Sequence, residues 1–182
     1  MAGLEEISKA FSSFEHSAFR LEALDQYLVD YERPVFEAFL RDEWIDYPND
    51  NMEKWVEYVA EQSKAGKLMQ RVHPMPDPLT DYLRFEIERG YSLTIPAGEQ
   101  IHTINSRLFE EIVIDNGFQI VFEQWKTRDY WLFDDNDLFL MYYKEDGTFV
   151  EVKRENNHDS VLHAVKIRDT FLSNPDLRTL ST

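Results

Sequence analysis

Adjacent carboxylates are the first residues of this sequence that could do chemistry: Asp134 and Asp135 stand in the run Asp-Asp-Asn-Asp at 134–137. Hard cations such as Ca²⁺ prefer several carboxylate oxygens placed close together, so a cation site is one interpretation. An EF-hand loop, however, needs a glycine after its alternating ligands and a glutamate further along, whereas apolar residues resume here at 138–140. The run therefore favours a polar turn between two strands, with a cation or ligand site as the alternative.

A second concentration of polar groups is the stretch Asp-Tyr-Leu-Arg-Phe-Glu at 81–86. On a helix, Arg84 can pair with Asp81 three residues earlier, which is the structural interpretation. The functional alternative is that Tyr82, Arg84 and Glu86 line a recognition pocket.

Familiar catalytic and cofactor motifs are missing from the sequence. The histidines show no pair at i, i+4 with the glutamate of a zinc hydrolase between them, and without cysteine there is no thiolate ligand or nucleophile. The 6 glycines are isolated, which excludes a phosphate-binding loop or a dinucleotide fingerprint, and no Gly-x-Ser-x-Gly elbow occurs. We therefore predict no catalytic residue, no metal site and no cofactor.

Length and composition indicate one folded domain over residues 1–182. Hydrophobic residues make up 43% and aromatic residues 14% of the chain, enough to bury a substantial core. The formal net charge of −16 makes direct binding to nucleic-acid phosphates unfavourable. We interpret the acidity as a solvated surface, with a DNA-mimicking or basic-partner-binding face as the sharper alternative.

Localisation is predicted from what the sequence lacks. The first residues show no basic flank followed by an apolar stretch, and no apolar run reaches the roughly 18 residues of a membrane helix. The absence of cysteine suits a reducing compartment. We expect a cytoplasmic protein without a membrane segment.

Hydrophobic spacing predicts alternating helices and strands in the first half. Apolar residues recur three to four apart over 4–14, a pattern typical of a helix that docks on a core. The expected elements after it are a strand at 18–22, helices at 34–41 and 51–66, a strand at 68–75 and a helix at 79–89 ending near Gly90.

The second half is rich in β-branched and aromatic residues and predicts mostly strands. These are expected at 91–95, 100–104, 111–114, 118–122, 130–133, 138–143 and 148–154. Asn116-Gly117 and Asp146-Gly147 are hairpin signals, and a last helix is expected at 160–172. The predicted fold is α+β, a largely antiparallel sheet with about five helices packed on it.

Four stretches resemble an uncharacterised domain family common in actinobacteria. They are Phe-Arg-Leu-Glu at 19–22 with Tyr27, and the segments 78–86, 97–99 and 129–135. The resemblance spans residues 15–172, which leaves 1–14 as an N-terminal docking helix. Members of that family are often encoded beside helix-turn-helix regulators, so the resemblance implies a regulatory neighbourhood and a protein partner, without implying a reaction.

These stretches also supply the candidate residues for binding a ligand or partner: Arg20, Glu22, Tyr82, Arg84, Glu86, Trp131, Asp134 and Asp135.

A weaker similarity is to the closing half of phospholipase-D-like domains, some of which act as ligand sensors. It rests on a strand ending in Asp-Asp, then a hairpin and a final amphipathic helix. The catalytic signature of that superfamily is His-x-Lys followed by Asp, and His163, Lys166 and Asp169 have the wrong spacing. The similarity therefore implies an inactive, sensor-like domain.

The function predicted from the sequence is that of a non-enzymatic regulatory or partner-binding protein working with a helix-turn-helix regulator. Two alternatives stay open: an enzyme with a carboxylate and histidine site acting on a phosphodiester, and an acidic DNA-mimic inhibitor. The sequence also leaves a homodimer open.

Overall fold

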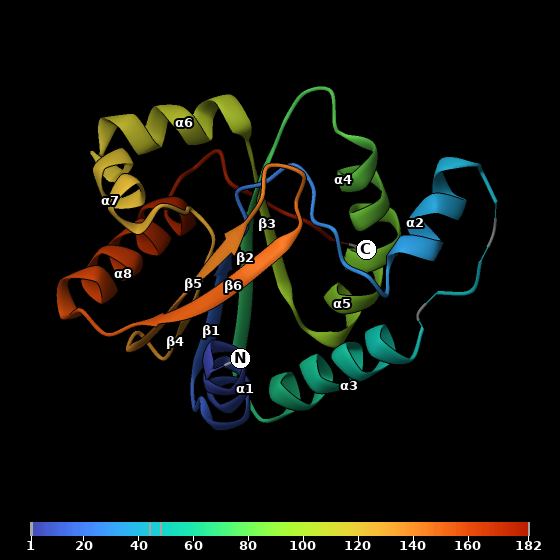
Figure 1. The fold of residues 1–182 in the computed structure, drawn as a ribbon, viewed down its shortest axis with the longest axis horizontal. Coiled ribbons are helices and arrows are strands. Elements are labelled where there is room, and N and C mark those ends of the chain that lie inside the picture. Colours follow the sequence, from blue (N-terminus) through green and yellow to red (C-terminus); the bar gives the residue numbers. More distant parts are fainter. Residues whose placement is uncertain (1, 44, 48, 182) are drawn as a thin grey trace.

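One mixed β-sheet organises the part of the chain that the computed structural model describes, which is residues 2–43, 45–47 and 49–181 (Figure 1). From edge to edge its seven strands are β6 (Phe149–Glu155), β5 (Asp137–Tyr143), β4 (Tyr130–Phe133), β1 (Ser17–Leu21), β2 (Leu68–Met75), β3 (Gln100–Asn105) and β7 (Arg178–Thr179). The strands β1, β2 and β3 are parallel to one another, and the remaining pairs are antiparallel.

Helices connect the strands and cover the sheet. They are α1 (Ala2–Ser13), α2 (Arg33–Leu40), α3 (Asp50–Lys64), α4 (Asp81–Phe85), the π-helical segment η1 (Glu86–Tyr91), α5 (Ser92–Ala97), α6 (Ser106–Asp115), α7 (Phe118–Trp125) and α8 (His158–Leu172). The segments α4, η1 and α5 follow one another without a break, so the described residues hold seven continuous helical stretches.

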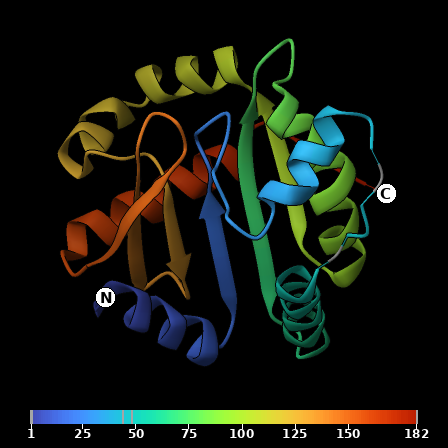
Figure 2. The same cartoon turned by 45° about the vertical axis from the view of Figure 1, so that its right-hand side comes forward.

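Each face of the sheet carries its own apolar core, because side chains alternate along the strands. On one face, Phe19 and Leu21 pack with residues of α6, α7 and α8. On the other face, Trp131 and Phe133 pack with residues of α1 and α3. Figures 1 and 2 show these two groups of helices around the central strands.

The predicted α+β class is confirmed, whereas the predicted sheet and helix number are wrong in detail. The chain leaves β1, passes through α2 and α3, and returns as β2, and it leaves β2 through α4, η1 and α5 to return as β3. Such crossovers place neighbouring strands in parallel, which the strand pattern alone does not reveal. The strands of the first half therefore add a parallel part to the sheet, which is mixed and not largely antiparallel.

Predicted strands at 111–114 and 118–122 are helices instead, and so is the predicted strand at 91–95. In α6, Phe109, Ile112 and Val113 lie at helical spacing and are buried together, so tertiary packing outweighs the strand preference of their β-branched neighbours. Gly117, with φ of +70°, makes a turn between two helices and not a hairpin.

The polar run at 134–137 connects β4 and β5, as the sequence predicts, with 134–136 forming the turn and Asp137 beginning β5. This turn also stabilises the fold. The Asp134 carboxylate accepts hydrogen bonds from the backbone N–H groups of Glu15, His16 and Ser17 at 2.7, 2.7 and 2.8 Å. Partial burial by itself would raise the pKa of Asp134, but these three N–H groups lower it below its ordinary value. Asp134 thereby ties the start of β1 to the β4–β5 turn.

Replacing this carboxylate should weaken the fold. We expect Asp134→Ala to lower the free energy of unfolding at pH 7 by about 1–2 kcal/mol, the usual effect of removing a capping acceptor. Because the folded-state pKa is depressed, this contribution exists above the ordinary aspartate pKa and disappears as the pH falls through the lowered value. Urea unfolding measures it. Asp134→Asn, which keeps one acceptor oxygen, should recover part of the loss, and an Ala variant as stable as the wild type would contradict the assignment.

Candidate functional site

A pocket of about 410 Å³ lies beside the end of β1, between the sheet and the helices that connect its parallel strands. Its lining comes from the loop after β1, from α3, from η1 and α5, and from the ends of β5 and β6. The face presented by η1 and α5 consists of Glu86, Gly90, Tyr91 and Thr94. A π-helical stretch of this kind is frequent at functional sites.

Two arginines lie on the sheet directly opposite each other beneath this region. Arg20 on β1 and Arg71 on β2 are register partners in a parallel pair, and their side chains are only 2% and 11% exposed. Like charges in facing positions are destabilising, and a buried charge requires a paired partner. The arrangement therefore depends on carboxylates brought in from other segments.

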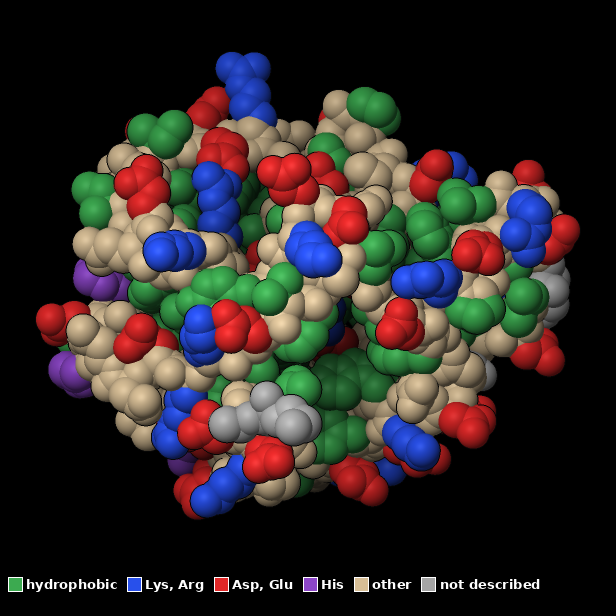
Figure 3. All heavy atoms as spheres, viewed as in Figure 1, with side chains coloured by type: hydrophobic (Ala, Val, Ile, Leu, Met, Phe, Trp, Pro, Cys, Tyr) green, Lys and Arg blue, Asp and Glu red, His purple; other side chains and the backbone are tan. Residues whose placement is uncertain are grey.

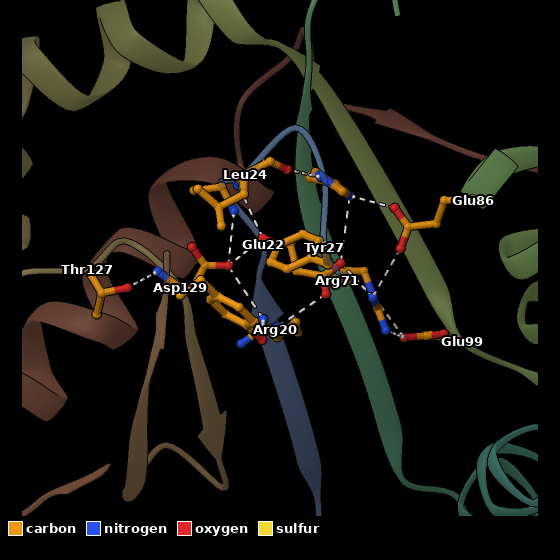
Figure 4. A network of polar contacts seen from close by, with 12 residues as sticks. Arg20, Glu22, Leu24, Tyr27, Arg71, Glu86, Glu99, Thr127 and Asp129 are labelled. Atoms are coloured by element: carbon orange, nitrogen blue, oxygen red, sulfur yellow. Dashed lines mark hydrogen bonds and ion pairs between the residues drawn. The ribbon is translucent and has the colours of Figure 1, made fainter. Parts of the chain in front are cut away.

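Arg71 has three acidic partners (Figure 4). Its Nη1 lies 2.5 Å from Glu22 Oε2 and 3.8 Å from Glu86 Oε1, and its Nη2 lies 3.0 Å from Glu99 Oε1. The guanidinium also lies over the ring of Tyr91, 5.5 Å from its centroid. Arg71 therefore connects the end of β1, η1 and the start of β3 through ion pairs.

Arg20 is bound on the opposite side of the same network. Its Nε lies 3.4 Å from Glu22 Oε1, and its Nη2 lies 3.4 Å from Asp129 Oδ1 and 3.1 Å from the Tyr143 hydroxyl. The Tyr27 hydroxyl donates to the same oxygen of Asp129. Glu22 bridges the two arginines and makes one connected network.

The acids of the network differ in their affinity for protons. Burial tends to raise the pKa of Glu22, but Arg71 and Arg20 lower it to about 2. Burial raises the pKa of Asp129 to about 6 in spite of Arg20. Burial and the neighbouring charge of Glu22 hold the pKa of Glu86 well above its usual range. Glu22 is thus the fixed anion, and Asp129 and Glu86 are the groups that take up protons.

His73 on β2 is a neutral member of the network. Its Nε2 lies 2.9 Å from the Leu24 carbonyl oxygen, which assigns the ring proton to Nε2, and its Nδ1 lies 2.8 Å from the Tyr91 hydroxyl. Complete burial lowers the pKa of His73. Its Nδ1 is 3.4 Å from Glu86 Oε2, which places an imidazole and a protonatable carboxyl next to each other.

The same residues have the chemistry of a metal site. Glu22, His73 and Glu86 each present one potential ligand atom, and these atoms lie within 4.8 Å of one another. Arg71 Nη1 already contacts Glu22 Oε2 at 2.5 Å, so a metal ion would have to displace a guanidinium from this carboxylate. No metal-ligand spacing is visible in the sequence because the three residues come from the end of β1, from β2 and from η1.

Unpaired oxygen atoms distinguish the pocket wall from an ordinary buried ion-pair network. Among the described residues, Glu86 Oε2, Thr94 Oγ1 and Glu99 Oε2 are buried and have no hydrogen-bond partner, and the same is true of Arg20 Nη1 in the network. Glu86 Oε2 keeps its 3.4 Å contact with His73 Nδ1. Glu86, Thr94 and Glu99 all line the pocket. Buried polar groups are normally paired, so unpaired ones in residues that line a cavity indicate a place for a ligand.

Arg20, Glu22 and Glu86 are the predicted site residues that the structure brings together. Two others lie close by: Tyr82 lines the pocket, and Trp131 lies beneath the Arg20 guanidinium, 5.6 Å from ring centroid to Cζ.

Arg84, Asp134 and Asp135 lie outside the pocket lining. Arg84 is half-exposed and pairs with Asp81 at 3.5 Å, as the structural interpretation of that helix expects. Asp134 binds backbone N–H groups, and Asp135 pairs with Arg168 on α8.

Sequence reasoning missed other members of the network, above all Arg71, His73 and Tyr91. Arg71 and His73 are two positions apart in a strand that the sequence predicts correctly, so their shared face was a signal for two buried polar groups on one side of the sheet. Glu99 and Asp129 belong to stretches that carry the family resemblance. The family resemblance could therefore have identified Glu99 and Asp129 as candidate site residues, whereas no motif spacing pointed to them.

Comparison with known proteins shows the family. Residues 5–174 match the family described as "Domain of unknown function (DUF6879)", and because the match covers most of the chain, the chain belongs to this family. No curated protein matches the chain significantly. Across residues 2–43, 45–47 and 49–181, no helix combines the length and the apolar composition needed to cross a lipid bilayer.

The raised pKa of Asp129 predicts a pH-dependent stability. The folded protein holds this proton more tightly than the unfolded chain does, so Asp129 lowers stability as the pH rises from about 4 to about 6. Asp129→Asn lacks this effect. The free energy of unfolding of the variant, relative to wild type, should therefore rise by about 3 kcal/mol over that interval.

Chemical denaturation of both proteins at several pH values measures this difference. Neutral His73 contributes the opposite slope, since burial lowers its pKa, but it does so in both proteins and cancels in the comparison. The exposed Asp176→Asn is the matched control and should follow wild type at every pH. A difference between Asp129→Asn and wild type that is constant with pH would contradict the assignment.

Proposed function

We propose that this protein is a non-enzymatic sensor domain that binds a small molecule in the pocket and regulates a protein partner in the cytoplasm. The observation that carries the proposal is the set of buried, unpaired oxygens on the wall of a 410 Å³ pocket. A pocket of this size suits a small organic molecule, and a few convergent polar groups among apolar and aromatic ones are typical of ligand sites.

The internal pairing of the network supports binding over catalysis. Both arginines and Glu22 are engaged in ion pairs with one another and with neighbouring segments. Groups that are held this firmly give a rigid wall that recognises a ligand without reorganising. The unpaired oxygens are then available for recognition.

A helix-turn-helix regulator is the partner we propose. The support is the family resemblance, together with a net charge of −16 that favours a partner with a basic surface. Ligand binding would change the affinity for this partner only if the two bound states differ in free energy, so the sensor hypothesis requires measurable coupling between ligand and partner.

An acid–base enzyme is the second candidate, and one contact favours it. Glu86, whose pKa is raised, lies 3.4 Å from the Nδ1 of neutral His73, the pairing that proton transfer to a phosphodiester would require. Against it, His73 Nε2 is bound to the Leu24 carbonyl oxygen and Tyr91 covers Nδ1. Hydrolysis of a chromogenic phosphodiester by wild type, abolished in Glu86→Gln, would favour this candidate over a sensor.

The DNA-mimic alternative has less support. Figure 3 shows Lys and Arg side chains interspersed with Asp and Glu over the face in view. A DNA mimic needs carboxylates gathered in a continuous array, so this distribution suits the sensor proposal better.

Filling the pocket should abolish ligand retention while leaving the fold intact. A Cβ at Gly90 would meet only Glu86 Cγ, at an ordinary 3.7 Å, and leucine is a better helix former than glycine. Gly90→Leu should therefore fold and occupy part of the pocket. The exposed Glu88→Leu, on the same helical stretch, is the matched control.

Each tagged protein is purified gently from its native cells and denatured, and the released small molecules are compared by mass spectrometry. We expect wild type and Glu88→Leu to release the same compound at close to one equivalent, and Gly90→Leu to release little. Adding that compound should change the recovery of the partner after nuclease treatment. Equal release from all three proteins, or no compound from wild type, would refute the sensor proposal.

A further inference from the structure

We infer that the ligand carries a protonated amine attached to an apolar body, with the ammonium group bound by Glu86, Thr94 and Glu99. This inference rests on the proposed function and names the chemical class of the ligand. It follows from the charge of the network, from the type of the unpaired atoms and from the apolar and aromatic character of the rest of the pocket.

The network contains more acids than bases. Two guanidiniums, Arg20 and Arg71, face four carboxyl groups, those of Glu22, Glu86, Glu99 and Asp129. With all six groups charged, the cluster would carry an excess of negative charge in a buried setting, which is unfavourable. Protons on Asp129 and Glu86, whose pKa values are raised by burial, remove this excess. A bound cation that replaces the Glu86 proton offsets the charge in the same way, whereas an anionic ligand would not.

The unpaired atoms of the residues that line the pocket are all able to accept hydrogen bonds, whereas the unpaired donor Arg20 Nη1 belongs to a residue outside that lining. Glu86 Oε2 and Glu99 Oε2 are carboxyl oxygens, and Thr94 Oγ1 is a hydroxyl oxygen. The Glu99 side chain is 1% exposed and Thr94 is 3% exposed, so water satisfies neither from the surface. An ammonium group has three donors and no acceptor, which matches this set. A carboxylate or phosphate would place its oxygens against these acceptors, and the guanidinium that lines the pocket, Arg71, is already engaged by Glu22 and Glu99.

Glu86 and Glu99, which carry two of these acceptors, lie beside the same guanidinium (Figure 4). Arg71 contacts Glu86 Oε1 at 3.8 Å and Glu99 Oε1 at 3.0 Å, so a single guanidinium already spans the two carboxyl groups. Glu86, Gly90 and Thr94 recur every four residues along η1 and α5, on the wall that faces the pocket. Gly90 contributes no side chain to this wall and leaves space for the ligand.

The remaining lining suits an organic molecule better than a bare metal ion. Met52 and Trp55 of α3 and Phe149 of β6 border the pocket, as do Tyr31 and Tyr82. Aromatic faces attract ammonium groups and pack against apolar bodies. An inorganic ion on Glu22, His73 and Glu86 would use the carboxylates and leave these surfaces without a role.

Matched probes test the inference directly. Phenethylamine, 2-phenylethanol and phenylacetate share one skeleton and differ in the head group, and butylamine, butanol and butyrate form a second set. Each is titrated at concentrations up to about millimolar into the full chain, with thermal shift and amide NMR as readouts, and Mg²⁺ and Mn²⁺ are tested alone. We expect the amines to stabilise the protein and to shift the Gly90 and Thr94 amide resonances, and the other probes to leave both unchanged.

Two variants locate the ammonium group. Glu86→Gln keeps the shape of the side chain and should weaken amine binding at least tenfold, while Thr94→Val should weaken it several-fold. Glu88→Gln, an exposed neighbour, is the control and should bind like wild type. Unfolding curves verify that each variant is folded before its affinity is interpreted.

Three results would overturn the inference: a carboxylate or alcohol probe that binds as well as its amine, a metal ion that binds while the amines do not, or amine binding unaffected by Glu86→Gln. In the first case the pocket still takes a small molecule, and the sensor proposal survives without this ligand class. Failure of every probe, amines included, would also overturn the inference. If, in addition, the protein purified from its native cells releases no compound, the sensor proposal is also refuted.

Discussion

The burial of two arginines in facing positions on neighbouring parallel strands is the constraint on which the rest of this structure depends. Arg20 and Arg71 are register partners on β1 and β2, in the middle of the sheet. Buried like charges so close together are tolerable only with anions between and around them. Glu22 lies between the two guanidiniums, and acids from more distant segments complete the arrangement.

Local backbone features serve this requirement. Gly98, with φ of +117°, ends α5 and lies so close to Ser63 of α3 that a Cβ would meet its side chain at 2.5 Å or less. The turn at Gly98 delivers Glu99 to Arg71 at the start of β3. The π-helical segment η1 likewise presents Glu86 and Tyr91 to the same group. The packing of α5 on α3 therefore positions residues of the ion-pair network.

The same arrangement explains why the pocket favours recognition of a cation. Arg20 directs its charge to Glu22 and Asp129, and Arg71, which lines the pocket, is engaged by Glu22 and Glu99. The unpaired atoms left on the lining residues are carboxyl and hydroxyl oxygens. Burial raises the pKa of Glu86, so in the empty pocket a proton can take the place of a bound cation. Proton and ligand would then compete for one carboxyl group, which couples ligand affinity to pH.

The sequence by itself determined the α+β class, the strands at 68–75 and 130–133, the polar turn at 134–137 and the final helix, because these depend on local periodicity and turn chemistry. It also offered Arg20, Glu22 and Glu86 as candidates. The parallel order of β1, β2 and β3, the helices at 111–122 and the roles of Arg71, His73 and Glu99 were decided only by the tertiary structure. The physical reason is that ion pairs join residues tens of positions apart, and burial, which no local pattern records, determines which of them must be paired.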